Sequence, residues 1–358
     1  SLTLTNNGDY GSPMINPWLD FAVDKAAYFG TTIEREGPDA AARLEAKRMV
    51  YRYCIFANTH SGGSSGGLAE GIPSDDFMVT LGAFPTTGGT VDEQAGTFMH
   101  ELGHALGLGH GGGDNLHYKP NYYSVMNYWW TMPNAWQGAT WGLRYSEHKL
   151  PTLDEMSLSE PSGIGAMLPG VVVPYRMSGA STCSTAFCWQ NPQTQDTGCF
   201  SYASLANNAA VDWNSDCHPT PGTVSADLND LSFLLPVNAT FDERVANGSG
   251  LTPLEGHNDW LNLHYNVQTT PTFAPGSSPQ ELYCRYDSEV IAFMSSIPPP
   301  PTTCLADTNG DGMVTPADFS AWVAAFNTQT PECDQNGDGS CTPADFSAWV
   351  ANYNAGCN

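Results

Sequence analysis

Three histidines and one glutamate at positions 100–110 have the residue types and the spacing of a metal site with a reactive carboxylate. His100 and His104 are four residues apart, so on a helix they project from the same face and both imidazoles can bind one ion. Glu101 can reach a water on that ion, and Gly107 allows the chain to turn back and bring in His110 as a third ligand. Because three protein ligands leave one position open, the pattern predicts one catalytic zinc. Surface histidines without a metal, and a zinc site without catalysis, are the alternatives.

A second motif, from Tyr123 to Tyr128, follows this segment. Together the two motifs resemble the metzincin clan of zinc metallopeptidases. The extended zinc motif of that clan is matched by His100, Glu101, His104, Gly107 and His110. Its methionine turn beneath the zinc is matched by Met126, and the turn is most similar to those of serralysins and astacins, in which a tyrosine two residues later lies at the zinc. That tyrosine is Tyr128 here, whereas the segment 111–122 departs from the astacin pattern.

The three ligands and the glutamate predict hydrolysis of a peptide bond. Zinc lowers the pKa of its water and polarises the substrate carbonyl, while Glu101 takes the proton of the water and passes it to the departing amine. The Tyr128 hydroxyl is a candidate for stabilising the oxyanion, although a core tyrosine without that role fits the same pattern. Met126 has no polar chemistry to offer and is interpreted as packing under the site.

The C-terminal part contains an internal repeat: Thr315–Ala324 recurs unchanged at Thr342–Ala351, each copy after a loop rich in Asp, Asn and Gly. Each loop places oxygen-bearing side chains at positions 1, 3 and 5, a glycine at 6 and a carboxylate at 12, as in EF-hand loops but with Asp for the usual Glu. Hard oxygen ligands at this spacing favour calcium, and a plain Asn-Gly-Asp-Gly turn is the alternative. The expected ligands of two calcium ions are Asp307, Asn309, Asp311, Met313 and Asp318 in loop one, and Asp334, Asn336, Asp338, Ser340 and Asp345 in loop two.

One loop and one helix per copy resemble the dockerin repeats, a pair of which forms a small calcium-folded module. Apolar residues recur at helical spacing in both copies and can pack on each other. They are Phe319, Trp322, Val323 and Phe326 in the first copy, and Phe346, Trp349, Val350 and Tyr353 in the second. Pro316-Ala317 and Pro343-Ala344 occupy loop positions at which cellulosomal dockerins carry polar residues that contact their partner. A protein partner of the module, such as a cohesin, therefore stays an open alternative.

The composition narrows the class of protein. With 37 acidic and 12 basic residues the formal charge is −25, which argues against nucleic acid as a partner because a phosphate backbone needs a basic surface. No stretch approaches the roughly 20 apolar residues of a membrane helix, so we expect no membrane span. Ten cysteines without the paired spacing of a zinc ribbon indicate disulfides, an oxidising setting and a secreted protein, with buried free cysteines as the alternative.

The cysteines are assigned to pairs by their place in the chain. Those of the C-terminal part flank loop two or bracket the repeats. Those of the N-terminal part would join a strand to a later helix or are near neighbours in the sequence, and the neighbour pairs are guesses among several connectivities. The expected pairs are Cys333–Cys341, Cys304–Cys357, Cys54–Cys284, Cys183–Cys188 and Cys199–Cys217.

The metal-binding residues need a scaffold of helices and strands, and the sequence predicts both. Periodicity and turn residues predict helices at 39–48, 92–106 and 279–296, strands at 50–56 and 77–84, and irregular chain at 129–265. The metzincin resemblance implies that the strand 77–84 forms the edge of the sheet and adds the substrate as a further strand. A central core strand is the alternative, because its residues form a continuous apolar run.

A proline-rich linker at 297–303 divides the chain, because consecutive prolines join neither helix nor sheet. We therefore expect a zinc metallopeptidase domain at 1–296, with an upper part to about 110 and a lower part from about 111, and a calcium-binding module at 304–358. The predicted fold class is α+β: a twisted sheet with an active-site helix above a cleft, an irregular lower subdomain with a C-terminal helix, and a small all-α dockerin-like module. The predicted function is that of a secreted zinc endopeptidase with a polypeptide substrate. A non-catalytic extracellular scaffold or adhesion protein is the alternative.

Overall fold

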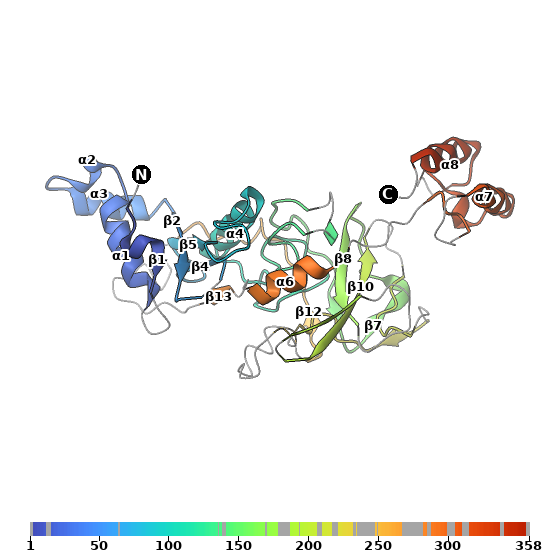
Figure 1. The fold of residues 1–358 in the computed structure, drawn as a ribbon, viewed down its shortest axis with the longest axis horizontal. Coiled ribbons are helices and arrows are strands. Elements are labelled where there is room, and N and C mark those ends of the chain that lie inside the picture. The colour runs from blue at the N-terminus through green and yellow to red at the C-terminus, as the bar shows by residue number, and fades with distance from the viewer. Residues whose placement is uncertain are drawn as a thin grey trace. The chain divides into compact units, whose positions relative to one another are not determined.

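The computed structural model contains helices and several small sheets, so the chain is an α+β protein (Figure 1). It divides into two compact units, Ser1–Pro298 and Pro299–Asn358, and this division falls within the expected linker 297–303. The structure describes residues 3–11, 16–63, 65–134, 136–137, 141–168, 170–177, 187–192, 194–205, 210–216, 221–231, 234, 248, 250–266, 282–284, 288–298, 305–309, 315–336 and 340–355.

Within these ranges the predicted helices at 39–48 and 92–106 are confirmed, and the predicted strands are present in shorter form. The helices are α1 (Pro17–Tyr28), α2 (Thr32–Arg35), α3 (Ala40–Arg48), α4 (Val91–Ala105), α6 (Ser288–Ser296), α7 (Pro316–Thr328) and α8 (Pro343–Ala355). The strands are β1 (Asp9–Tyr10), β2 (Tyr53–Ala57), β3 (Thr59–His60), β4 (Gly67–Ala69), β5 (Asp76–Thr80), β6 (Leu153–Asp154), β7 (Leu158–Ser159), β8 (Val172–Arg176), β9 (Phe187–Gln190), β10 (Thr197–Ser204), β11 (Thr223–Val224), β12 (Pro253–Leu254) and β13 (Leu282–Cys284).

The sheet of the N-terminal part has the strand order β13-β4-β5-β2. Strand β2 runs parallel to β5, whereas β4 runs antiparallel to β5, with Leu68 opposite Met78. Strand β5 therefore lies inside the sheet, and the expectation that the strand 77–84 forms its edge is wrong. All residues of β5 are buried, which explains why its three central residues, Phe77 to Val79, are all apolar instead of alternating with polar residues.

Helix α4 packs against β4 and β5, as Figure 1 shows. Its start is fixed by a capping box in which the Thr90 hydroxyl accepts a bond from the Glu93 N–H, and the Glu93 carboxylate accepts one from the Thr90 N–H. Its face toward the sheet is anchored by Phe98, whose ring lies 5.3 Å from that of Phe77. The helix ends at Ala105, and Gly107 follows with φ of +94°, a conformation that favours glycine.

The stretch 129–265 contains a second, antiparallel sheet, so the expectation of irregular chain is wrong for this part. Its strand order is β8-β10-β9. Phe200 of β10 is buried and packs on Phe293 of α6 with ring centroids 5.2 Å apart, so α6 covers this sheet. Alternation is weak in β9 and in the short strands β6, β7, β11 and β12, which explains why the sequence pattern did not reveal them.

The predicted helix at 279–296 is also corrected. Helix α6 begins only at Ser288, and residues 282–284 form β13, which pairs antiparallel with β4 so that Cys284 lies opposite Gly67. The chain therefore returns from the region after residue 111 to the N-terminal sheet. The expected upper and lower parts share this sheet instead of dividing near residue 110.

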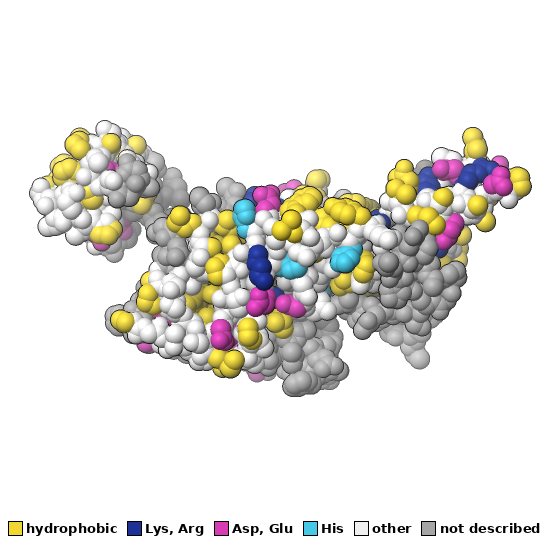
Figure 2. Space-filling view, turned by 180° about the vertical axis from the view of Figure 1, so that it is seen from behind, with side chains coloured by type: hydrophobic (Ala, Val, Ile, Leu, Met, Phe, Trp, Pro, Cys, Tyr) yellow, Lys and Arg dark blue, Asp and Glu magenta, His cyan; other side chains and the backbone are white. Residues whose placement is uncertain are grey.

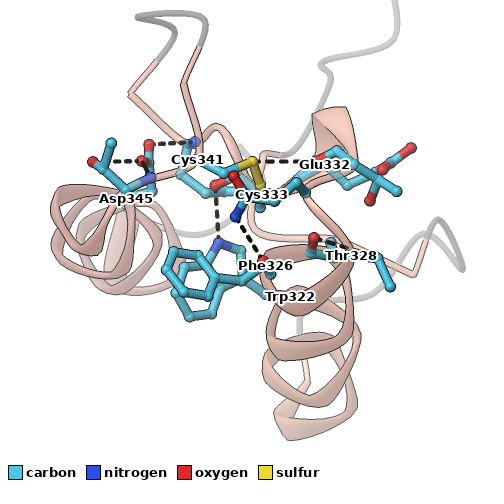
Figure 3. The surroundings of a disulfide bond; sticks show 12 residues. Trp322, Phe326, Thr328, Glu332, Cys333, Cys341 and Asp345 are labelled. Carbon is cyan, nitrogen blue, oxygen red and sulfur yellow. Dashed lines mark hydrogen bonds between the residues drawn. A yellow bond between two sulfur atoms is a disulfide. The ribbon is translucent and has the colours of Figure 1, made fainter.

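The C-terminal unit contains the two repeat helices and a disulfide between Cys333 and Cys341, the pair expected from the sequence (Figure 3). The indole of Trp322 donates a hydrogen bond to the carbonyl of Cys333 at 3.1 Å, which ties α7 to the turn before loop two. Phe319 packs on Phe346 with ring centroids 5.9 Å apart. The apolar faces of the two repeats therefore do pack on each other.

Among the described residues, no helix has the length and apolar character needed to cross a membrane. Figure 2 shows one face of the molecule, on which charged side chains are separated by wide stretches of neutral and apolar surface. Among the described residues on this face, the acidic side chains are therefore dispersed.

Candidate metal centre and active site

Helix α4 and the loop after it bring His100, His104 and His110 together. Each histidine offers one ring nitrogen, and these three nitrogens all lie within 4.8 Å of one another. The Nε2 atoms of His100 and His104 are 3.1 Å apart. All three side chains are buried. Their spacing in the sequence explains the meeting: the first two occupy one face of the helix, and the third follows the turn at Gly107.

A tight turn presents His110 to the other two histidines. Gly109 and Gly112 exchange two backbone hydrogen bonds of 2.7 Å and 2.9 Å, so His110 lies at the tip of a two-residue connection. Gly112 has φ of +83°, which explains the need for glycine there. The glycine-rich segment after the histidines therefore shapes the site.

The protonation of the histidines suits a metal. His100 Nδ1 lies 2.9 Å from the carbonyl of Val125, and His104 Nδ1 lies 2.7 Å from the carbonyl of Leu108. Because a carbonyl only accepts, each Nδ1 carries the proton, and each Nε2 keeps its lone pair for a ligand bond. Burial lowers the pKa of all three imidazoles, that of His104 to about 4, so they are neutral at pH 7. Three neutral nitrogens that converge in this way are a suitable donor set for zinc.

Glu101 follows His100 on α4, and its carboxylate lies against β4. A Cβ added to Gly67 would lie 2.6 Å from Glu101 Oε1, so β4 passes directly over the carboxylate, and only glycine fits there. The Glu101 side chain is buried. The strand therefore limits the positions that the Glu101 carboxylate can adopt.

Met126 packs beneath α4. It is buried, and a Cβ on Gly103 would overlap its sulfur, so Gly103 allows the turn to approach the helix closely. The backbone of this turn also orients His100, since Val125 supplies the carbonyl that accepts a hydrogen bond from it. The placement agrees with the interpretation of Met126 as a packing residue under the site.

Tyr128 is buried with its ring centroid 4.7 Å from that of His110 and 5.6 Å from that of His100. The structure thus brings this sequence-predicted residue to the histidine cluster. Both a substrate-contacting role and a core role are consistent with this location.

Two residues of the site were missed by the sequence reasoning. His117 lies with its ring centroid 4.3 Å from that of His110 and 4.7 Å from that of Tyr128. Asp259 accepts hydrogen bonds from Tyr122, Ser124 and Ser146 and thereby clamps the turn around Met126. The closeness of His117 to the motif was a usable signal, whereas nothing in the sequence connects Asp259 with a turn more than 130 positions earlier.

The structure overturns three of the expected disulfides. Cys188 pairs with Cys199, its direct neighbour across β9 and β10, which excludes the expected Cys183–Cys188 and Cys199–Cys217 pairs. Cys54 has a free thiol. It is on β2 while Cys284 is on β13, and two strands lie between them, which places them about 14 Å apart and beyond the reach of a disulfide. Cys183, Cys217, Cys304 and Cys357 lie outside the described residues.

The twelfth residues of both repeat loops are held in equivalent ways. Asp318 accepts hydrogen bonds from the backbone N–H groups of Thr315 (2.7 Å) and Asn309 (3.2 Å), and Asp345 accepts them from Thr342, Gln335 and Asn336. Burial acts to raise the pKa of Asp318, but these bonds outweigh it and lower the pKa overall. Both carboxylates thus face their loops.

The other expected calcium ligands are only partly described. Those that the structure includes are Asp307, Asn309, Asp334, Asn336 and Ser340. Asp311, Met313 and Asp338 lie outside the described residues. The structure therefore leaves calcium binding a prediction.

No family model, no curated protein and no solved structure matches the chain. The geometry of the site itself therefore carries the functional assignment.

Proposed function

We propose that this chain is a secreted, zinc-dependent endopeptidase of the metzincin type. The observation that carries the proposal is the convergence of three buried, neutral imidazoles, with Glu101 next to His100 on the same helix. The Nδ1 atoms of His100 and His104 are bound to backbone carbonyls. Three histidine ligands leave a position for water or substrate, which distinguishes catalytic from structural zinc. The methionine packed against Gly103 and the tyrosine beside His110 add support.

Each residue of the proposed site would have a separate role in the reaction. Zinc, when bound, would supply a Lewis acid and a water of lowered pKa. Glu101 would accept the proton of the attacking water and deliver it to the amine nitrogen when the C–N bond breaks. The Tyr128 hydroxyl would donate a hydrogen bond to the carbonyl oxygen as negative charge develops on it. His100 and His104 keep their orientation through the carbonyls of Val125 and Leu108.

The C-terminal unit is proposed to be a dockerin-like module that binds two calcium ions and contacts a protein partner. Its support is the duplicated sequence, the two helices that pack on each other, and the equivalent hydrogen bonds of Asp318 and Asp345 to their loops. The disulfides Cys188–Cys199 and Cys333–Cys341 support a location in an oxidising compartment.

The proposal is tested by cleavage of an unfolded protein with the full chain, before and after treatment with 1,10-phenanthroline, and again after zinc is restored. We expect one zinc per chain and cleavage that the chelator abolishes. Glu101→Gln, which keeps the shape of the side chain, and Glu101→Ala should both retain zinc and lose about 10²- to 10⁴-fold in turnover. Cleavage that survives the chelator or the loss of Glu101 would refute the assignment, and a zinc-loaded chain without any cleavage would favour a scaffold.

A further inference from the structure

His117 is the histidine next to the metal centre that the zinc motif does not include. Its ring lies against both His110 and Tyr128, with centroids 4.3 Å and 4.7 Å away. Among the described residues, the ring nitrogens that lie within 4.8 Å of one another are those of His100, His104 and His110, and His117 does not belong to this group. It is 7% exposed, whereas His110 and Tyr128 are each 1% exposed. His117 is thus the most exposed of these three side chains, although it is still largely buried.

The backbone around His117 is held unusually firmly for a loop. Three consecutive carbonyls each accept a hydrogen bond from a fully buried side chain. These bonds are Asn229 Nδ2 to His117 O (2.9 Å), Trp129 Nε1 to Tyr118 O (2.9 Å) and Asn127 Nδ2 to Lys119 O (2.8 Å). Together they fix the Cα position of His117 and therefore the region that its imidazole can occupy.

The same segment also contains backbone strain. Tyr118 has φ of +60°, a left-handed conformation that a bulky side chain rarely adopts. Strain of this kind persists where the surrounding structure enforces it, and it is concentrated at functional sites. The Tyr118 ring is in turn packed 5.6 Å from Tyr128, so the strained residue links His117 to the tyrosine of the site. This construction is the one expected for a side chain that must be oriented before substrate arrives.

We propose that His117 is a further catalytic residue, which donates an imidazole N–H to the substrate carbonyl oxygen together with the Tyr128 hydroxyl. This inference rests on the proposed peptidase function. In the step concerned, the oxygen of water bonds to the carbonyl carbon, its proton goes to Glu101, and the carbonyl π pair moves onto the oxygen. His117 keeps its proton and only donates a hydrogen bond. The proton on Glu101 then passes to the amine nitrogen as the C–N bond breaks, which restores the carbonyl.

Three substitutions of His117 separate hydrogen bonding from packing. His117→Phe keeps a flat ring against His110 and Tyr128 but removes the donor. His117→Asn and His117→Gln place an amide N–H near the former Nδ1 and Nε2, respectively. His148→Phe replaces an exposed histidine outside the site and serves as the matched control.

Each variant is assayed as the full chain for kcat, KM, zinc affinity by chelator competition, and affinity for a phosphinic peptide that mimics the tetrahedral oxyanion. For His117→Phe we expect kcat to fall about 10²- to 10³-fold, KM to change by less than about threefold, and phosphinic peptide affinity to fall by a factor similar to that of kcat/KM. Zinc affinity should stay unchanged, and at least one amide variant should recover about tenfold or more in kcat.

Three results would overturn the role of His117. The first is a His117→Phe enzyme with the kcat and phosphinic peptide affinity of the parent. The second is a variant whose zinc affinity falls about tenfold or more, because His117 would then act through the metal. The third is a set of amide variants no more active than His117→Phe, which would indicate packing alone. If the parent chain itself shows no chelator-sensitive cleavage, the proposed function fails rather than the role of His117.

Discussion

Replacement of Asp259 tests how the turn around Met126 is held. The Asp259 side chain is 0% exposed and accepts three hydrogen bonds: Tyr122 OH at 2.7 Å, Ser124 Oγ at 2.5 Å and the Ser146 N–H at 2.8 Å. Ser124 Oγ in turn accepts from the Met126 N–H at 3.2 Å. The carboxylate therefore connects a distant loop with the residues that lie beneath the histidines.

The expected loss in the free energy of unfolding depends on which hydrogen-bond donors lose their acceptor. Asp259→Ala removes the carboxylate acceptor of three buried donors, which we expect to lower the free energy of unfolding by about 3–5 kcal/mol. Asp259→Asn keeps an oxygen at the position that serves Ser124 and Ser146, and the Tyr122 hydroxyl can rotate to accept from the new amide. The asparagine variant should therefore lose only about 1 kcal/mol.

Two measurements on the full chain check this expectation. Thermal unfolding should show a melting temperature lower by about 8–15 °C for Asp259→Ala and by about 2–4 °C for Asp259→Asn. Zinc affinity, measured by chelator competition, should fall about 10- to 100-fold for the alanine variant, because the loosened turn supplies the Val125 carbonyl that orients His100.

Two outcomes would refute the reasoning. If Asp259→Ala melts within about 2 °C of the parent, the three hydrogen bonds do not carry the stability assigned to them. If it is destabilised as expected but binds zinc with unchanged affinity, the turn does not position the ligands.

Three further predictions concern other parts of the chain. Gly103→Ala should lower the free energy of unfolding by about 1–3 kcal/mol through overlap with the Met126 sulfur, and Met126→Ala should reduce that cost in a double-mutant cycle. Burial raises the pKa of Glu155 to about 7, so the contribution of its protonated form to stability, present below pH about 4, is lost as pH rises through 7. Glu155→Gln should remove up to about 3 kcal/mol of this pH dependence in unfolding titrations. An unchanged dependence of stability on pH would contradict this prediction. Removal of the Cys333–Cys341 disulfide by paired serines should destabilise the C-terminal unit by about 2–3 kcal/mol, seen as faster hydrogen exchange in α7 and α8.

The parts of the fold that depend on neighbouring residues could be predicted from the sequence. The capping residues Thr90 and Glu93 mark the start of α4, and Gly107 marks the turn after it, because both signals act within a few positions of the residues they affect. The meeting of the three zinc-motif histidines follows from the same local geometry.

The parts that depend on distant segments could not be predicted. Strand β5 is central because β4 and β2 lie on either side of it, and β4 is too short for an alternating pattern to be visible. The Cys188–Cys199 disulfide follows from the register of β9 and β10, which the sequence did not reveal as strands. The role of Asp259 likewise could not be predicted, because it arises only when the fold brings this residue to the turn around Met126.

The free thiol of Cys54 has a consequence for the order of events during folding. Burial, with a smaller contribution from the nearby charge of Glu101, raises the pKa of Cys54 above its ordinary value, so almost no thiolate forms at neutral pH once β2 is in the sheet. Exchange with a disulfide requires a thiolate, so the folded chain protects its Cys188–Cys199 bond from attack. Before β2 joins the sheet, however, the Cys54 thiol can compete for the other cysteines. Early assembly of this sheet therefore favours correct pairing of the other cysteines.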